Sequence, residues 1–119
     1  MSKILVADDA SFMRLMIRQI LARQGQTDIL EAENGRVAVE FFRQHKPDLT
    51  LLDITMPELD GLATLTEILT MEPSAKVIMC SAVAQEQIVQ EALSRGAVDF
   101  VVKPFRPNEL MQAVSKYLV

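Results

Sequence analysis

The sequence predicts an α/β fold: a doubly wound, five-stranded parallel sheet with strand order 2-1-3-4-5, built from five βα units. Two observations support this prediction. The runs at 4–7 and 77–80 are apolar throughout, as in strands that helices cover on both faces. A segment with helical spacing follows each of five short strand-like runs, which begin near Lys3, Asp28, Asp48, Lys76 and Val98.

The elements of the first half of the chain follow this pattern in order. After the first strand, Met13 and Met16 belong to an apolar stripe of the first helix and are predicted core residues. The run 28–33 mixes charged with apolar residues, which predicts that the second strand lies at an edge of the sheet. Asn34 and Gly35 predict a turn that leads into the second helix.

The second half continues the pattern. Cys80 lies within the apolar fourth strand and is a predicted core residue, whereas His45 is predicted to be a solvent-exposed helix end. Pro47, Pro73 and Gly96 follow helical segments, where helices are expected to stop. The third and fifth helices carry core-facing stripes made of Leu62, Leu65 and Leu69, and of Leu110, Val114, Tyr117 and Leu118.

Composition excludes several classes of protein. The length of 119 residues predicts one domain over residues 1–119, with no linker and no effector domain, and we expect a monomer. A net charge of −4 with scattered basic residues argues against nucleic-acid binding. The longest apolar runs have four residues, too few for membrane insertion. Charges at Lys3, Asp8 and Asp9 interrupt any signal peptide, and Cys80 has no disulfide partner, so we expect a cytoplasmic location.

Five polar side chains are predicted to meet at one rim of the sheet. Asp8 and Asp9 follow the first strand, Asp53 follows the third, Ser81 ends the fourth and Lys103 follows the fifth. In such sheets the ligand crevice lies beyond the carboxyl ends of the strands, where the strand order reverses. The convergence of these residues is a stronger indication of function than any one of them.

The three carboxylates predict a divalent cation. Close carboxylates repel one another, by about 1 to 4 kcal/mol per pair at surface dielectric values, and a cation relieves this repulsion. A few hard oxygen ligands suit Mg²⁺, which keeps several waters and shares positions with phosphate oxygens. Lys103 and the Ser81 hydroxyl can both bind phosphoryl oxygens, so the residues predict phosphoryl chemistry.

Each residue also has a structural interpretation when it is taken alone. Asp8 or Asp9 could cap the first helix, Asp53 could be a turn residue, and Lys103 could be an edge lysine. At the level of function, the alternatives are a small phosphatase with an aspartate nucleophile, a flavin carrier and a binding module. Thr55 occupies the position where such a phosphatase places a second acid, which counts against that alternative.

The sequence resembles the receiver domain of bacterial two-component response regulators, specifically the stand-alone, CheY-like chemotaxis type, over residues 3–119. The resemblance rests on four stretches in order: Asp8-Asp9, residues 53–61, residues 80–82 and residues 103–105. It implies the (βα)5 receiver fold, which is flavodoxin-like. It also implies a signalling protein that assists its own phosphorylation and dephosphorylation, rather than an enzyme.

The resemblance also implies a role for each site residue. Asp53 would accept a phosphoryl group from a histidine kinase, and Mg²⁺ would be held by Asp8, Asp9, Asp53 and the Thr55 carbonyl. Ser81 and Lys103 would bind the phosphoryl group, and the Lys103-Pro104 bond would be cis. Ser81 and Phe100 would form the switch that changes the face of helix four, strand five and helix five. Alternative roles are a phosphate sink or a phosphorelay intermediate.

Four residues depart from the family pattern. Phe100 stands where the chemotaxis proteins usually have tyrosine, and Glu86 and Ala113 lie on a face that is commonly lysine-rich. The family implies a flagellar motor switch protein or a phosphatase as further partners, and these departures count against the motor. Val83 is apolar where a polar side chain often influences the hydrolytic water, which predicts an altered phosphoryl lifetime.

Overall fold

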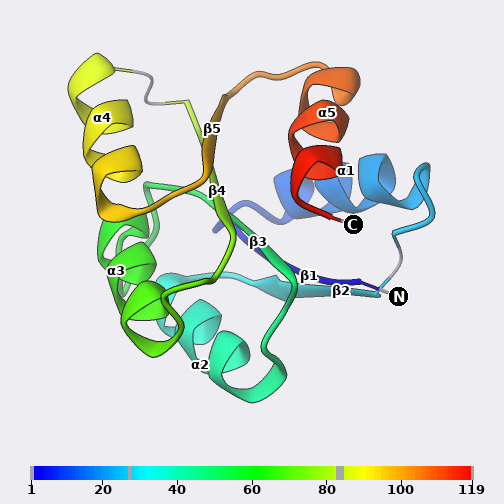
Figure 1. Cartoon of the computed structure of the whole chain (residues 1–119). Coiled ribbons are helices and arrows are strands. Elements are labelled where there is room, and N and C mark those ends of the chain that lie inside the picture. Colours follow the sequence, from blue (N-terminus) through cyan, green and yellow to red (C-terminus); the bar gives the residue numbers. More distant parts are fainter. Residues whose placement is uncertain (1, 27, 83–84, 119) are drawn as a thin grey trace.

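The computed structural model describes residues 2–26, 28–82 and 85–118. Five parallel strands form one sheet in the order β2-β1-β3-β4-β5, which confirms the predicted topology (Figure 1). The strands are β1 (Lys3–Ala7), β2 (Asp28–Ala32), β3 (Leu49–Leu52), β4 (Val77–Ser81) and β5 (Asp99–Val102). The helices are α1 (Ser11–Ala22), α2 (Gly35–His45), α3 (Gly61–Met71), α4 (Glu86–Arg95) and α5 (Pro107–Tyr117).

The sheet separates two hydrophobic layers. Helices α1 and α5 cover one face, and α2, α3 and α4 cover the other (Figure 1). Alternate residues of β1 enter opposite layers: Ile4 and Val6 pack with α1 and α5, whereas Leu5 and Ala7 pack on the other side. This arrangement explains why β1 is apolar throughout, because both of its faces are buried.

Local signals set the boundaries of the helices. The Asn34 side chain accepts a hydrogen bond from the Val37 amide at 2.9 Å, so the predicted turn is the N-cap of α2. Asp60 caps α3 in the same way, through the Ala63 amide at 2.9 Å. Gly96 ends α4 with φ 114°, a left-handed conformation that favours glycine.

The predicted core residues are either buried or partly buried against the core, with the exception of Met16. Cys80 is buried, and burial raises the pKa of its thiol to about 12. His45 is exposed at the end of α2, as predicted. Met16 is 37% exposed, which corrects the prediction that it is a core residue. It lies just outside the stripe of α1 that reaches the sheet, and only Met13 of the two methionines packs against the core.

Among the residues that the structure describes, no helix is both long enough and apolar enough to cross a membrane.

Candidate functional site

The carboxyl ends of the strands bring three acids together. Asp8 and Asp9 follow β1, and Asp53 follows its neighbour β3. Carboxylate oxygens of these three residues lie within 4.8 Å of one another. Asp8 and Asp53 are buried, whereas Asp9 is exposed, so the acid cluster (Asp8, Asp9 and Asp53) opens to solvent on one side.

Hydrogen bonds fix Asp8 firmly at the end of β1. Its amide donates to the Ala32 carbonyl at 3.0 Å, and its Oδ1 accepts from the Ala10 amide at 2.9 Å. Ala10 is the N-cap residue of α1, and its own side chain makes no capping hydrogen bond. The Asp8 carboxylate bonds to the amide of this N-cap residue and also faces the acid cluster with Asp9, so helix capping alone does not account for the pair.

Asp53 is held in a partly desolvated position. Its amide donates to the Ala7 carbonyl at 3.0 Å, and its Oδ1 accepts from the Ile54 amide at 2.8 Å. Burial raises the pKa of Asp53 above its usual value. Lys103 and the amides of Ile54 and Thr55 oppose this rise, and the Asp8 carboxylate adds to it. Burial therefore costs the charged form of Asp53 more than it would cost an exposed carboxylate, and a cation beside Asp53 would offset this cost.

Lys103 supplies the positive charge that faces the cluster. Its amide donates to the Ser81 carbonyl at 2.9 Å, which ties it to the end of β4, and the Lys103-Pro104 bond is cis. Its Nζ forms an ion pair with Asp8 and lies 3.6 Å from Asp53 Oδ2. The side chain is only 11% exposed, so it is not a solvated edge lysine.

The loop after Asp53 approaches the site with little clearance. The Gly61 amide donates to the Ile54 carbonyl at 2.7 Å, and a Cβ at Gly61 would lie 2.0 Å from the Asp53 carbonyl oxygen. A Cβ at Gly35 would lie 2.0 Å from the Leu59 carbonyl oxygen on the same loop. Only glycine allows these close approaches, so both residues help to position Asp53.

The donor set fits Mg²⁺. The ligands that the acid cluster offers are hard carboxylate oxygens, and their number leaves positions for water and for phosphoryl oxygens. The Lys103 ammonium lies among these carboxylates and offsets part of their negative charge. A divalent cation beside the exposed Asp9 would offset more of it.

The remaining predicted residues lie around the acid cluster. Thr55 is exposed, two residues after Asp53, and its amide bonds to the Asp53 carboxylate. Ser81 is buried at the end of β4, and Phe100 is half-buried on β5 against the layer of α2, α3 and α4. Val83 lies outside the described residues, so its prediction stays untested.

Sequence reasoning missed Arg14. Its guanidinium reaches back from α1 and donates to the Asp8 carbonyl at 2.6 Å. The only sequence signal is an arginine five residues after Asp9, and the period of the helix does not reveal its contact with Asp8.

A hollow of about 650 Å³ lies away from the acids. It is lined by residues that precede β3 and β4, including Lys46, Asp48 and Lys76, and so lies at the amino ends of the strands. None of the predicted site residues lines it. The chemistry belongs to the acid cluster, because among the described residues only that end of the sheet joins carboxylates with a buried ammonium.

Fold and site together define a phosphoacceptor module of the two-component type, and the chain belongs to the response regulator receiver domain family, whose model matches residues 4–115. It is 48% identical to chemotaxis protein CheY of Bacillus subtilis, over 98% of this chain and 97% of that protein. It is 49% identical to chemotaxis protein CheY of Listeria monocytogenes, over 98% of both chains. A crystal structure of the Borrelia burgdorferi CheX–CheY complex with BeF3 and Mg²⁺ superimposes with a TM-score of 0.95. The identity there is 36%, with 99% of this chain and 90% of that chain covered.

These comparisons decide between the functional alternatives. The chain is a CheY-like receiver, a signalling protein that accepts a phosphoryl group, and not a phosphatase or a flavin carrier. Full-length relatives from Bacillus subtilis, Thermotoga maritima and Listeria monocytogenes are chemotaxis proteins, which supports chemotaxis as the process in which this chain acts.

Proposed function

We propose that Asp53 accepts a phosphoryl group from a histidine kinase in a Mg²⁺-dependent reaction, and that the product signals through the face of α4, β5 and α5. The observation that carries this proposal is the meeting of three carboxylates and the Lys103 ammonium at one end of the sheet. The similar Borrelia burgdorferi CheY, crystallised with BeF3 and Mg²⁺, supports it.

The site residues take different parts in the proposed reaction, and Asp53 takes two of them. Asp8, Asp9, Asp53 and the Thr55 carbonyl hold Mg²⁺, which when bound neutralises negative charge on the phosphoryl oxygens. A carboxylate oxygen of Asp53 forms the new P–O bond while the P–N bond to the donor histidine breaks, and the released imidazole takes up a proton. The Ser81 hydroxyl and Lys103, which turns from Asp8, bind the transferred oxygens.

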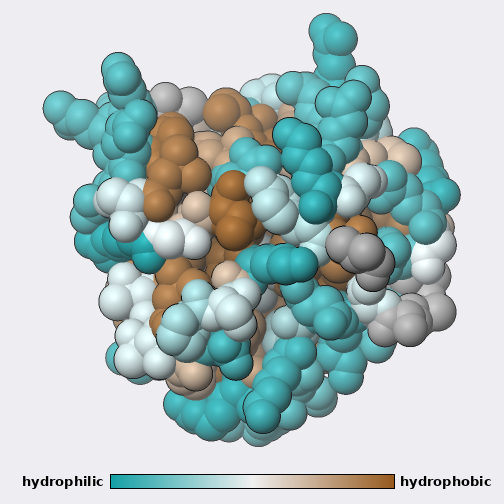
Figure 2. Space-filling view, in the orientation of Figure 1, coloured by the Kyte–Doolittle hydropathy of each residue, from teal (hydrophilic) through white to brown (hydrophobic). Residues whose placement is uncertain are grey.

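The output face has an anchored helix and exposed apolar side chains. Leu93 of α4 and Val102 of β5 are 41% and 45% exposed, and Figure 2 shows apolar surface in this region. Such surface supports contact with a protein partner. Phe100 lies beside it on β5, where movement of Ser81 toward the phosphoryl group would let the ring turn inward.

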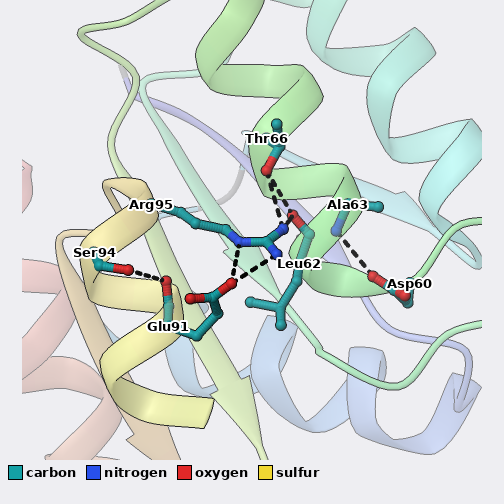
Figure 3. A network of polar contacts seen from close by, with 7 residues as sticks. All are labelled: Asp60, Leu62, Ala63, Thr66, Glu91, Ser94 and Arg95. Atoms are coloured by element: carbon teal, nitrogen blue, oxygen red, sulfur yellow. Dashed lines mark hydrogen bonds and ion pairs between the residues drawn. The ribbon is translucent and has the colours of Figure 1, made fainter. Parts of the chain in front are cut away.

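The C-terminal end of α4 is tied to α3 by Arg95 (Figure 3). Its Nη1 donates at 3.2 Å to both the Leu62 carbonyl and the Thr66 hydroxyl, and Glu91 holds the guanidinium at 2.8 Å. The proposed signal therefore moves the N-terminal half of α4 relative to this anchored end.

The surface of α1 supports docking of the kinase. Phe12 and Leu15 are 71% and 54% exposed, and Phe12 lies three residues after Asp9. Large apolar side chains in this position suit a helical partner that brings its phosphohistidine to the acid cluster. Phe12→Ala should slow transfer from the kinase and leave phosphorylation by a small donor unchanged.

We propose further that residues 1–119 act as one monomeric receiver domain in the cytoplasm. The chain spans 97% of the Bacillus subtilis CheY, which supports a stand-alone receiver.

The test is phosphorylation by a small donor, acetyl phosphate with Mg²⁺, followed by intact mass. We expect one stoichiometric adduct that is stable in acid and labile in alkali. Asp53→Asn should abolish it. The matched control is Asp60→Asn, which alters an exposed helix cap outside the acid cluster and should retain it. An adduct on Asp53→Asn, or no adduct on the wild-type chain, would overturn the proposal.

A further inference from the structure

Charged side chains of α1 and β2 support the loop that carries Asp8 and Asp9. Arg14 is one turn into α1, and its side chain is only 15% exposed. Its Nη1 donates to the Asp8 carbonyl at 2.6 Å, and its Nε donates to Glu31 at 3.1 Å on the edge strand β2. One guanidinium therefore joins the helix, the loop and the edge strand.

Glu31 is itself held in place. Its second oxygen accepts from Arg18 Nε at 2.9 Å, and the Arg18 Nη2 donates to the Ile29 carbonyl at 3.2 Å. In the register of the sheet, Glu31 lies opposite Val6, two residues before Asp8. The position of Arg14 is thus set by a fixed carboxylate rather than by a mobile surface side chain.

The contact to Asp8 is made through the main chain. The Asp8 carbonyl belongs to the peptide group that joins Asp8 to Asp9, so a donor on this oxygen fixes the orientation of that peptide plane. Rotation of the plane would change the direction in which the Asp9 carboxylate leaves the chain. The hydrogen bonds of Arg14 go to Glu31 and to the Asp8 carbonyl, not to the carboxylate of Asp8 or Asp9. Its effect on these two carboxylates therefore passes through the backbone.

We propose that Arg14 is a positioning residue for the Mg²⁺ site, which it serves by holding the Asp8–Asp9 peptide in the orientation that aims both carboxylates into the acid cluster. This inference rests on the proposed function. Outer-shell partners of this kind typically change metal affinity by about 10- to 100-fold when they are removed.

Loss of the charge of Arg14 and loss of its contact with Asp8 predict opposite changes in Mg²⁺ affinity. Arg14→Ala removes a positive charge near the metal, so electrostatics alone predicts tighter Mg²⁺ binding. Loss of positioning predicts weaker binding, by about tenfold. Arg18→Ala is the matched control, because it removes the same charge and another arginine partner of Glu31. The hydrogen bonds of Arg18 go to Glu31 and to the Ile29 carbonyl, and not to Asp8. We expect the Mg²⁺ affinity of Arg18→Ala to stay within about twofold of the wild-type affinity, because an exposed charge contributes little.

The experiment titrates each chain with MgCl2 in the absence of any phosphoryl donor and follows the amide signals of Asp9 and Asp53 by NMR. Urea unfolding in chelator measures the stability of each variant separately. Arg14→Lys keeps the charge but cannot span Asp8 and Glu31 with one ammonium, so it should also weaken Mg²⁺ binding and tests the role if Arg14→Ala does not fold.

The outcomes separate this inference from the proposed function. A wild-type chain without a saturable response to Mg²⁺ would overturn the metal site and the role of Arg14 together. A wild-type chain that binds, with Arg14→Lys or Arg14→Ala binding as tightly or more tightly, would overturn only the role of Arg14. Equal weakening by Arg18→Ala, which leaves the Arg14 contact with Asp8 in place, would show that this contact does not govern Mg²⁺ affinity and would also overturn the role of Arg14.

Discussion

Substitution of Gly61 by alanine tests how closely the loop after β3 is coupled to Asp53. A Cβ at this position would lie 2.0 Å from the Asp53 carbonyl oxygen and 2.5 Å from the Ile54 Cα. Both of these are backbone atoms, so neither can rotate away as a side chain would. The two segments must separate, and the segment that moves carries the phosphoacceptor.

The geometry sets the size of the effect. Real Cβ atoms essentially never approach another heavy atom within 3.0 Å, so the backbone around Asp53 must open by about 1 Å. A misplacement of about 1 Å can slow a positioned reaction by about 10²-fold. Overpacking of this kind also destabilises a fold by about 1 to 3 kcal/mol. We therefore expect Gly61→Ala to fold, with phosphorylation slowed by about 10²-fold.

The assay compares rate constants of phosphorylation by acetyl phosphate at saturating Mg²⁺, together with urea unfolding. Gly25→Ala is the control, because Gly25 has φ 80° and no atom within 4 Å of the added Cβ. It should lose about 1 kcal/mol of stability to its left-handed backbone and keep the wild-type rate. If Gly61→Ala reacted at the rate of Gly25→Ala, the coupling between this loop and Asp53 would be refuted.

Three further predictions follow from single contacts. Because burial raises the pKa of Asp53, Asp53→Asn should unfold at a higher urea concentration than wild type when chelator is present. This gain in stability should grow as pH rises from the usual pKa of 3.8 through the raised pKa of Asp53. A gain in stability that shrank as pH rose would contradict this reasoning. Lys103→Ala should still accept phosphoryl but lose the change in the Phe100 NMR signals, and an undiminished change would exclude Lys103 from the switch. Thr50 is fully buried, and its hydroxyl has no partner within the described part of the chain. Thr50→Val should therefore raise the free energy of unfolding by about 1 kcal/mol in the same urea assay. A fall in the free energy of unfolding would mean that a water satisfies the hydroxyl.

The sequence by itself determined the fold and the composition of the site. Apolar runs, helical stripes and the residues that follow each strand depend on local spacing, which the chain displays directly, and parallel strands bring their carboxyl ends to one edge. For this reason the sequence places Asp8, Asp9, Asp53 and Lys103 at one rim, where the structure brings them together. The start of β5 was predicted within one residue, at Val98 rather than Asp99.

Only the tertiary structure decided which contacts these residues make. Met16 has the residue type and helical spacing of a core residue, but the stripe of α1 that meets the sheet is too narrow to cover it. The ion pair between Lys103 and Asp8 joins residues 95 positions apart, and Arg14 reaches Glu31 across 17. Such contacts depend on how helix and sheet pack, because side-chain direction and distance are three-dimensional properties that the period of a sequence does not contain.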